Sequence, residues 1–290
     1  MSEESTILDA GPGAGDAPPV ILTVAPNGAR KVKADHPAVP LDAGEIGECA
    51  RDCRNAGAAM IHLHVRNPDG SHSLDAGLYR EAIGEIRNRV GDDILIQVTS
   101  EAVGIYTADE QMAMVHELEP EAVSLAIREI CPDDAMEADC RNFLSWVEEA
   151  GVMPQYILYS DEDVRRFDAL RKKGIVPGSR PFVLYVLGRY NAGQKSDPSD
   201  LLPFLAAQAE AAPVNWAMCA FGAKEAGCAL TAAALGGHVR LGFENNTLLA
   251  DGSVAPDNAA LLRQFGESVL MVGRRLATSE EARHTLSNGK

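Results

Sequence analysis

Short apolar runs alternate with longer amphipathic stretches along most of the chain. Apolar runs of this length that end in turn residues are typical of buried strands. Strands are predicted at residues 20–25, 58–64, 94–98, 122–125, 155–159, 181–187, 215–220 and 238–242. The stretches between them are amphipathic with helical periodicity, which predicts helices. These helices are predicted at residues 41–56, 75–90, 107–118, 134–150, 161–173, 201–211, 224–235 and 257–276.

Residues that favour element ends mark several of these boundaries. Asp42 is a suitable N-cap for the first helix, and Gly57 is a suitable C-cap. Thr107 and Glu110 have the spacing of a capping box. Pro181 fits only the first position of a strand.

The order of the elements predicts the fold. Strand and helix alternate strictly, which implies parallel strands with right-handed crossovers, and eight such units favour one closed (β/α)₈ TIM barrel over residues 20–290. A doubly wound sheet is the alternative, but it would need a glycine-rich phosphate turn after the first strand, and Asn27-Gly28-Ala29 is too short for one. Residues 1–19, rich in Gly, Ala and Pro, are predicted to be a disordered tail.

Composition narrows the class of protein. A length of 290 residues suits one such barrel, and a net charge of −16 argues against a nucleic-acid partner. The six cysteines form no Cys-x-x-Cys pair, which indicates a reducing compartment. No apolar stretch is long enough to span a bilayer, and the acidic N-terminus does not resemble a secretory signal. We therefore expect a cytoplasmic protein without a membrane partner.

The segment His62-Leu63-His64-Val65-Arg66 closes the second predicted strand. Side chains alternate along a strand, so His62 and His64 point to the same face. Two imidazoles on one face can bind one metal ion, although two histidines hydrogen-bonded inside a core are the plainer alternative. Chemistry in barrels takes place at the C-terminal ends of the strands, where this pair lies.

A second cluster lies at the end of the eighth predicted strand. If this strand stays regular, His238, Arg240 and Glu244 share a face. Only the first strand separates the second from the eighth in a closed barrel, so His62, His64 and Glu244 could form a metal site with open positions. Arg240 would then hold a carboxylate or stabilise an oxyanion. The alternative is a structural ion pair between Arg240 and Glu244.

Polar residues also follow the other predicted strands. They are Asn27 and Arg30 after the first, Thr99, Ser100 and Glu101 after the third, Ser124 in the fourth, and Tyr159 and Ser160 after the fifth. Each could simply be solvated, but together they predict a polar barrel mouth for a small oxygenated substrate.

Three segments together resemble the beta-keto acid cleavage enzyme family, which includes 3-keto-5-aminohexanoate cleavage enzyme. The segments are residues 23–29, residues 56–70 and residues 236–246, and the resemblance runs from about residue 20 to the end. It implies an acyltransferase with a zinc-dependent TIM barrel, which condenses a beta-keto acid with acetyl-CoA to give acetoacetate and a new acyl-CoA. It also implies a homotetramer.

The resemblance assigns roles to particular positions. It implies that His62, His64 and Glu244 bind one zinc ion, although a His₂Glu site also suits cobalt or manganese. Arg240 matches the arginine of the family, and Thr99 falls at its substrate-binding Ser/Thr. Asn27, Ser100 and Ser124 are further substrate-binding candidates by their places at strand ends.

Two positions depart from the family pattern. Asn245 occupies the catalytic position where the family has an aspartate that acts as base with the arginine, and an amide cannot accept a proton at neutral pH. A zinc-bound hydroxide, or Glu101 turned inward, could replace it. Arg30 falls near the position where the aminohexanoate enzyme of the family has an acidic residue for the amine of its substrate. An arginine there favours an anionic or neutral keto acid, such as a beta-keto dicarboxylate. The segment 126–131 also differs from the small, glycine-containing stretch of the family.

Two other functions remain open from the sequence alone. One is a metal-dependent hydrolase, although such barrels place further histidines after the fifth and sixth strands, and none is present there. The other is a non-catalytic metabolite-binding barrel, which the amide at Asn245 would suit.

Overall fold

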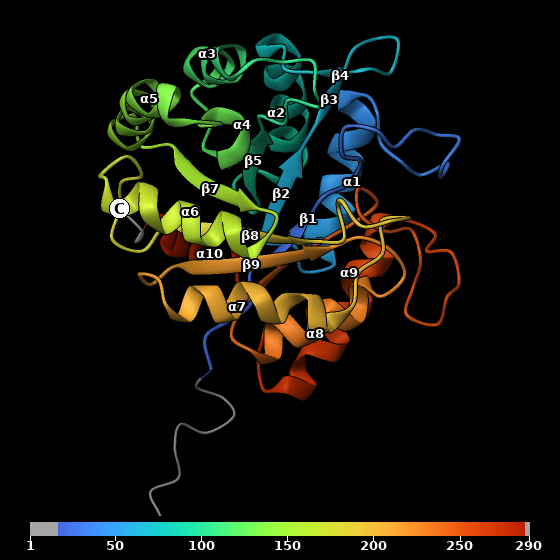
Figure 1. The fold of residues 1–290 in the computed structure, drawn as a ribbon. Helices are drawn as coiled ribbons and strands as arrows, with labels where there is room; N and C mark the ends of the chain where they lie inside the picture. Colours follow the sequence, from blue (N-terminus) through green and yellow to red (C-terminus); the bar gives the residue numbers. More distant parts are fainter. Residues whose placement is uncertain (1–16, 288–290) are drawn as a thin grey trace, which may run out of the picture.

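Eight parallel strands close into a barrel in the computed structural model, which describes residues 17–287 (Figure 1). The strand order around the barrel is β1-β10-β9-β8-β7-β6-β5-β2. The strands are β1 Leu22–Val24, β2 Met60–Leu63, β5 Leu95–Thr99, β6 Ala122–Ala126, β7 Met153–Leu158, β8 Phe182–Leu187, β9 Asn215–Ala220 and β10 His238–Leu241. The predicted (β/α)₈ barrel is thus confirmed, while residues 1–16 of the predicted tail lie outside the described residues.

Helices surround the barrel, one or more after each strand (Figure 1). They are α1 Ala43–Asn55, α2 Ala76–Val90, α3 Ala108–Leu118, α4 Ile127–Ile130, α5 Glu137–Glu149, α6 Asp161–Lys172, α7 Leu202–Ala209, α8 Glu225–Ala234, α9 Asn258–Val269 and α10 Ser279–Ser287, with short 3₁₀ turns η1 Asp134–Met136, η2 Pro198–Leu201 and η3 Leu270–Val272. Asp42 caps α1, and Thr107 and Glu110 form the predicted capping box of α3. No helix in the described part of the chain is long and apolar enough to cross a membrane.

The C-terminal segment differs from the single helix predicted over residues 257–276. Helix α9 ends at Val269, a left-handed turn follows at Gly273, and Leu276 pairs with Val20 beside β1. A further helix, α10, then packs Ala282 and Leu286 into the same buried cluster as barrel residues of the strands. Thr278 and Glu281 exchange capping hydrogen bonds at its start, and this spacing was a readable helix signal in the sequence.

Two smaller elements were also absent from the sequence prediction. Strand β3 (Val65–Arg66) and strand β4 (His72–Ser73) form an antiparallel hairpin directly after β2. Helix α4 begins within the segment 126–131, immediately after β6. Both elements lie at the C-terminal ends of the strands, so they shape the mouth of the barrel.

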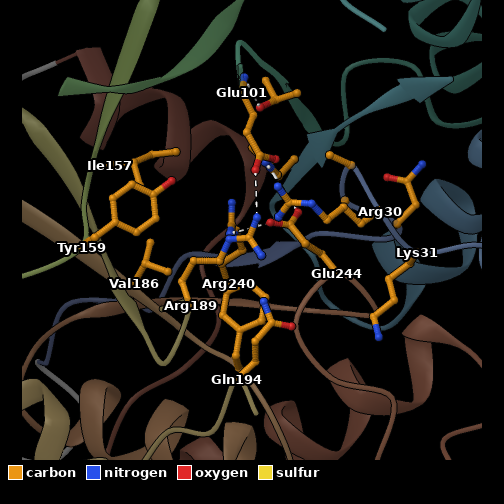
Figure 2. Close-up of a pocket in the computed structure, with 16 residues that line it drawn as sticks. Arg30, Lys31, Glu101, Ile157, Tyr159, Val186, Arg189, Gln194, Arg240 and Glu244 are labelled. Atoms are coloured by element: carbon orange, nitrogen blue, oxygen red, sulfur yellow. Dashed lines mark hydrogen bonds and ion pairs between the residues drawn. The ribbon is translucent and has the colours of Figure 1, made fainter. Parts of the chain in front are cut away.

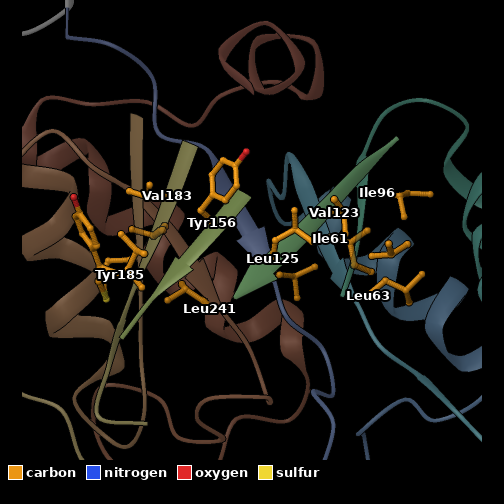
Figure 3. Close-up of a cluster of buried hydrophobic side chains, with 14 of the residues drawn as sticks. Ile61, Leu63, Ile96, Val123, Leu125, Tyr156, Val183, Tyr185 and Leu241 are labelled. Carbon is orange, nitrogen blue, oxygen red and sulfur yellow. The ribbon is translucent and has the colours of Figure 1, made fainter. Parts of the chain in front are cut away.

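Two apolar layers hold the fold together. The larger layer lies between the barrel and the helices and includes Ile61, Leu63, Val123 and Leu241, which point out of the barrel (Figure 3). The smaller layer fills one end of the barrel interior, where α10 covers it. Farther along the strands toward their C-terminal ends, polar side chains from β2, β5 and β10 join the apolar ones in the interior, which indicates that end of the barrel for the candidate chemistry.

Candidate active site

A pocket opens at the C-terminal ends of the barrel strands (Figure 2). Its lining includes His62 from β2, Thr99 from β5, Arg240 from β10 and Glu244 from the turn after β10. These four residues, which come from distant parts of the sequence, were all predicted site residues. The barrel therefore brings them to one place, as its topology requires.

Three potential metal ligands converge at this pocket. His62 Nε2 and His64 Nε2 lie 3.0 Å apart, and Glu244 Oε2 lies 3.7 Å and 3.4 Å from them. Glu244 Oε2 is buried and has no hydrogen-bond partner, while two ring nitrogens face each other. Two imidazoles and one unpaired carboxylate oxygen in this arrangement fit one divalent cation, with positions left for substrate.

The charge states of His62 and Glu244 suit this role. Burial, followed by the nearby Arg240 charge, holds the pKa of His62 well below its usual value, so the imidazole is neutral. Burial would raise the pKa of Glu244, but the Arg240 guanidinium and the two histidines outweigh it and lower that pKa. A neutral imidazole and an ionised carboxylate are the forms that bind metals.

A chain of buried glutamines fixes the orientation of His62. Gln97 Nε2 donates to Gln155 Oε1 at 3.2 Å, which leaves Gln97 Oε1 to accept a hydrogen bond from His62 Nδ1 at 2.8 Å. His62 therefore carries its proton on Nδ1 and presents the lone pair of Nε2 to the site. Neither Gln97 nor Gln155 was predicted from the sequence as a site residue. Both are polar residues within apolar strand runs, and His62 and Gln97 are register partners on adjacent strands.

Glu244 reaches the site through a turn rather than along a regular strand. Strand β10 ends at Leu241, and Gly242 adopts φ +138°. Any Cβ at Gly242 would lie 2.3 Å from the carbonyl oxygen of Ala25, so only glycine fits. Glu225 then holds the turn from inside, since its carboxylate accepts hydrogen bonds from Gly242 N and Asn246 Nδ2.

The ion pair that we considered as an alternative is also present. Arg240 Nη2 donates to Glu244 Oε1 at 2.9 Å and to Cys219 Sγ at 3.3 Å. Glu244 can serve both purposes because Oε1 faces Arg240 and Oε2 faces the histidines. Arg240 Nε is buried without a partner, which leaves a donor for a bound anion.

The other predicted site residues divide into two groups. Asn27 and Arg30 line the pocket, and the Asn27 amide also holds the barrel mouth by donating to Pro40 O and His64 O. Ser100 and Ser124 are buried, do not line the pocket, and are linked by a hydrogen bond from Ser100 Oγ to Ser124 O.

Asn245 also lies outside the pocket lining. Its side chain is buried, and neither its amide oxygen nor its amide nitrogen has a hydrogen-bond partner. Its backbone accepts a hydrogen bond from Gly222 N, which ties the turn after β10 to the end of β9.

The pocket wall is cationic although the whole chain carries a net charge of −16. Its charged side chains are Arg30, Lys31, Arg189 and Arg240 against Glu101 and Glu244. An apolar patch of Ile157, Val186 and Phe221 also lines the pocket, and Figure 2 shows Ile157 and Val186 across from Arg30 and Lys31. Such a pocket suits an anionic molecule with a short carbon chain.

A family model for beta-keto acid cleavage enzymes matches residues 19–287. The chain belongs to this family. A 3-keto-5-aminohexanoate cleavage enzyme of Fusobacterium nucleatum is 31% identical over 92% of this chain and 97% of its own length. A 3-oxoadipate:acetyl-CoA acetyltransferase of Cupriavidus necator is 28% identical over 92% and 94%.

The fold of this beta-keto acid cleavage enzyme is also found in a solved structure. The apo structure of ObcA matches with a TM-score of 0.69, at 14% identity, over 88% of this chain and 66% of ObcA. Family membership confirms the resemblance noted from the sequence, and with it an enzyme that acts on beta-keto acids.

Proposed function

We propose that the protein condenses an anionic or neutral beta-keto acid with acetyl-CoA to form acetoacetate and a new acyl-CoA, with one zinc ion bound by His62, His64 and Glu244. One observation carries the proposal. Three metal-ligand atoms converge beside Arg240, inside a cationic pocket, in a chain of this family. Acetyl-CoA enters the proposal because relatives are named for its use.

The protein residues divide the work of binding and activation. Bound zinc would act as a Lewis acid toward a substrate carbonyl. The free Nε–H of Arg240 would donate to the substrate carboxylate or to an oxygen that gains charge during the reaction. Thr99 Oγ accepts a hydrogen bond from Glu101 N, so its own hydroxyl proton is available to a substrate oxygen.

The far end of the substrate would meet Arg30. Arg66, from the motif after β2, donates to the backbone carbonyls of Gly28 and Lys31 and so holds the loop that carries Arg30. Arg30 has no hydrogen bond or ion pair in the described residues and lines the pocket. A guanidinium that is free to pair favours a second carboxylate, which agrees with a relative named for 3-oxoadipate.

The proposal is tested by incubating the purified protein with zinc, acetyl-CoA and a panel of beta-keto acids. We expect acetoacetate, with the highest kcat/KM for a dicarboxylic keto acid and the lowest for an aminated one. Hydrolysis without acetyl-CoA would favour a hydrolase, and tight binding without turnover a binding protein. Strands β7 and β8 supply no histidine in the described structure, which counts against the hydrolase.

Metal analysis and molar mass complete the test. We expect one zinc per chain, lost in a His62→Ala/His64→Ala double variant. We also expect the chain to form a homo-oligomer, namely the homotetramer that the family resemblance implies. Sedimentation equilibrium would contradict this part of the proposal if it gave the 30.9 kDa of a single chain.

A further inference from the structure

The proposed reaction needs a group that removes a proton from the substrate carbon between the two carbonyls. Among the described residues that line the pocket, the imidazole, carboxylate and phenol side chains are those of His62, Glu101, Tyr159 and Glu244. His62 and Glu244 face the metal site. Burial raises the pKa of Tyr159 well above its usual value, so its phenol stays protonated. Glu101 is the carboxylate that remains.

Glu101 lies on the pocket wall next to the metal-ligand candidates, because it follows β5 and β5 pairs with β2, the strand that carries His62. It follows β5, and Figure 2 shows its carboxylate pointing into the pocket toward Arg189 and Arg240. Its Oε1 lies 3.3 Å from Arg189 Nη2, and 17% of its side chain is exposed. Because part of the Glu101 side chain is exposed at the pocket, its carboxylate can contact a substrate bound there. The neighbouring Arg189 guanidinium keeps the carboxylate directed into the pocket.

Both backbone polar groups of Glu101, its N–H and its carbonyl oxygen, are hydrogen-bonded to neighbouring side chains. Its N–H donates to Thr99 Oγ at 3.0 Å, and its carbonyl oxygen accepts from His72 Nε2 at 2.9 Å. Burial lowers the pKa of His72 to about 3, so this histidine is a neutral donor rather than a competing acid. The β3–β4 hairpin, which carries His72, therefore fixes the position of Glu101.

Asn245 cannot supply the same function. Its amide has no basic lone pair at neutral pH, and its side chain is buried outside the pocket lining. Burial raises the pKa of Glu101 above its usual value, which makes this carboxylate a stronger base than a solvated one.

We propose that Glu101 is the catalytic base of this enzyme, an inference that rests on the proposed function. Its carboxylate takes the proton from C2 of the keto acid, and the C–H electron pair forms the enolate. C2 then bonds to the thioester carbon of acetyl-CoA, and the C–S bond breaks to release the CoA thiolate. The thiolate adds to the original keto carbon, and the bond from that carbon to C2 breaks to give the new acyl-CoA. The protonated Glu101 returns its proton to C2 of acetoacetate.

The test compares Glu101→Gln with wild type and with Glu129→Gln. Glu129 is a neighbouring carboxylate that accepts a hydrogen bond from Ala102 N but does not line the pocket, so it is a matched control. Exchange of the C2 hydrogens of 3-oxoadipate is followed by NMR in D₂O. Acetoacetate formation with acetyl-CoA, zinc content and the Kd of 3-oxoadipate are measured alongside.

We expect Glu101→Gln to lose ~10²-fold or more in both rates, as for other general bases, with zinc content and Kd unchanged. Glu129→Gln should stay within about twofold of wild type, since an amide oxygen can still accept from Ala102 N. Glu101→Asp should recover part of the loss, because it keeps a carboxylate. Wild-type rates in Glu101→Gln, or a Kd that weakens as much as the rates fall, would overturn the assignment. A wild-type protein without exchange or acetoacetate would instead overturn the proposed function.

Discussion

Individual atoms, rather than whole side chains, decide what this site can bind. Glu244 directs one oxygen to Arg240 and the other to the histidines, and His62 directs Nδ1 to Gln97 and Nε2 to the candidate metal position. Neither arrangement depends on the residue type alone. Each depends on neighbouring groups whose hydrogen bonds decide which atom carries the proton and which atom is left with a free lone pair.

Replacing Gln97 by leucine should weaken zinc binding. The buried Nδ1–H of His62 would lose its acceptor, so the ring would no longer be held with Nε2 toward the metal. Loss of such a partner typically weakens metal binding by about 10- to 100-fold. Competition with a chromophoric chelator measures the Kd. Gln111→Leu is the control, since Gln111 is equally buried but lies in α3 away from the site; equal shifts in both variants would contradict the prediction.

Replacing Arg30 by alanine should lower kcat/KM for a dicarboxylic keto acid. An exposed ion pair contributes up to about 1 kcal/mol, so the expected loss is several-fold. A keto acid with a neutral end serves as the control substrate and should be affected less. An unchanged kcat/KM toward the dicarboxylic acid would show that Arg30 points to solvent.

The candidate site residues whose convergence could be predicted from the sequence are those with local patterns. His62 and His64 are two apart on a strand, and Arg240 and Glu244 lie in one short segment. Gln97 and Gln155 were not assigned roles at the candidate metal site, because their roles arise from strand register. No pattern within their own segments shows which side chain lies opposite.

Among the secondary-structure elements, the turn after β10 has the strictest requirements. The parity argument placed Glu244 on the inward face of a regular strand, but the strand ends at Leu241 and the turn delivers the carboxylate. The α9–α10 segment was mispredicted for a related reason. Helical periodicity continues past Val269, whereas the break at Gly273 and the pairing of Leu276 with Val20 depend on tertiary contacts.

Replacing Gly242 by alanine should destabilise the protein more than replacing Gly236. Both glycines have positive φ, but a Cβ at Gly242 would strike the Ala25 backbone, whereas a Cβ at Gly236 meets open space. Gly236→Ala should cost about 1–2 kcal/mol from its backbone conformation alone. Gly242→Ala should cost clearly more, measured as the free energy of unfolding in urea. Equal costs would contradict the steric argument.

The Glu225 carboxyl group, which is hydrogen-bonded to the turn after β10, should make the free energy of unfolding depend on pH. Burial raises the pKa of Glu225 to about 8 in the folded protein, against 4.5 for an ordinary glutamate. The folded state then binds the proton more tightly than the unfolded state, so this contribution is present at low pH and is lost as pH rises from about 5 to 8.

Urea unfolding of zinc-free protein across this range measures the effect. The slope of the unfolding free energy should be more negative in wild type than in Glu225→Gln, by at most about 1.4 kcal/mol per pH unit. Parallel pH dependences would contradict the raised pKa.

For the whole molecule, the candidate chemistry lies at one end of the barrel, where the interior apolar layer reaches the pocket wall through Ile157, Val186 and Phe221. The layer beneath the helices and the layer closed by α10 contain none of the three metal ligands. Eight paired strands close the barrel around the pocket by backbone hydrogen bonds, so we expect the fold to form without the metal. The sequence was sufficient to predict this architecture because its periodicity repeats eight times.

Removal of zinc should therefore lower Tm without unfolding the protein. Binding to the folded state alone stabilises by about 4 kcal/mol when free zinc is 1,000 times its Kd, and a chelator removes that contribution. We expect the far-UV circular dichroism at 25 °C to be unchanged while Tm falls. The His62→Ala/His64→Ala variant should have a Tm indifferent to zinc. Loss of the helical signal on chelation would contradict the prediction.

Closure of one end of the barrel by α10 affects how molecules enter and leave. Ala282 and Leu286 are buried against the strands there, so in the described part of the chain the pocket at the other end is the route that the proposed substrates and products would use. A molecule that sits against His62 and Glu244 cannot pass one that fills the mouth. We therefore expect a compulsory order in which the keto acid enters before the thioester and acetoacetate leaves after the new acyl-CoA.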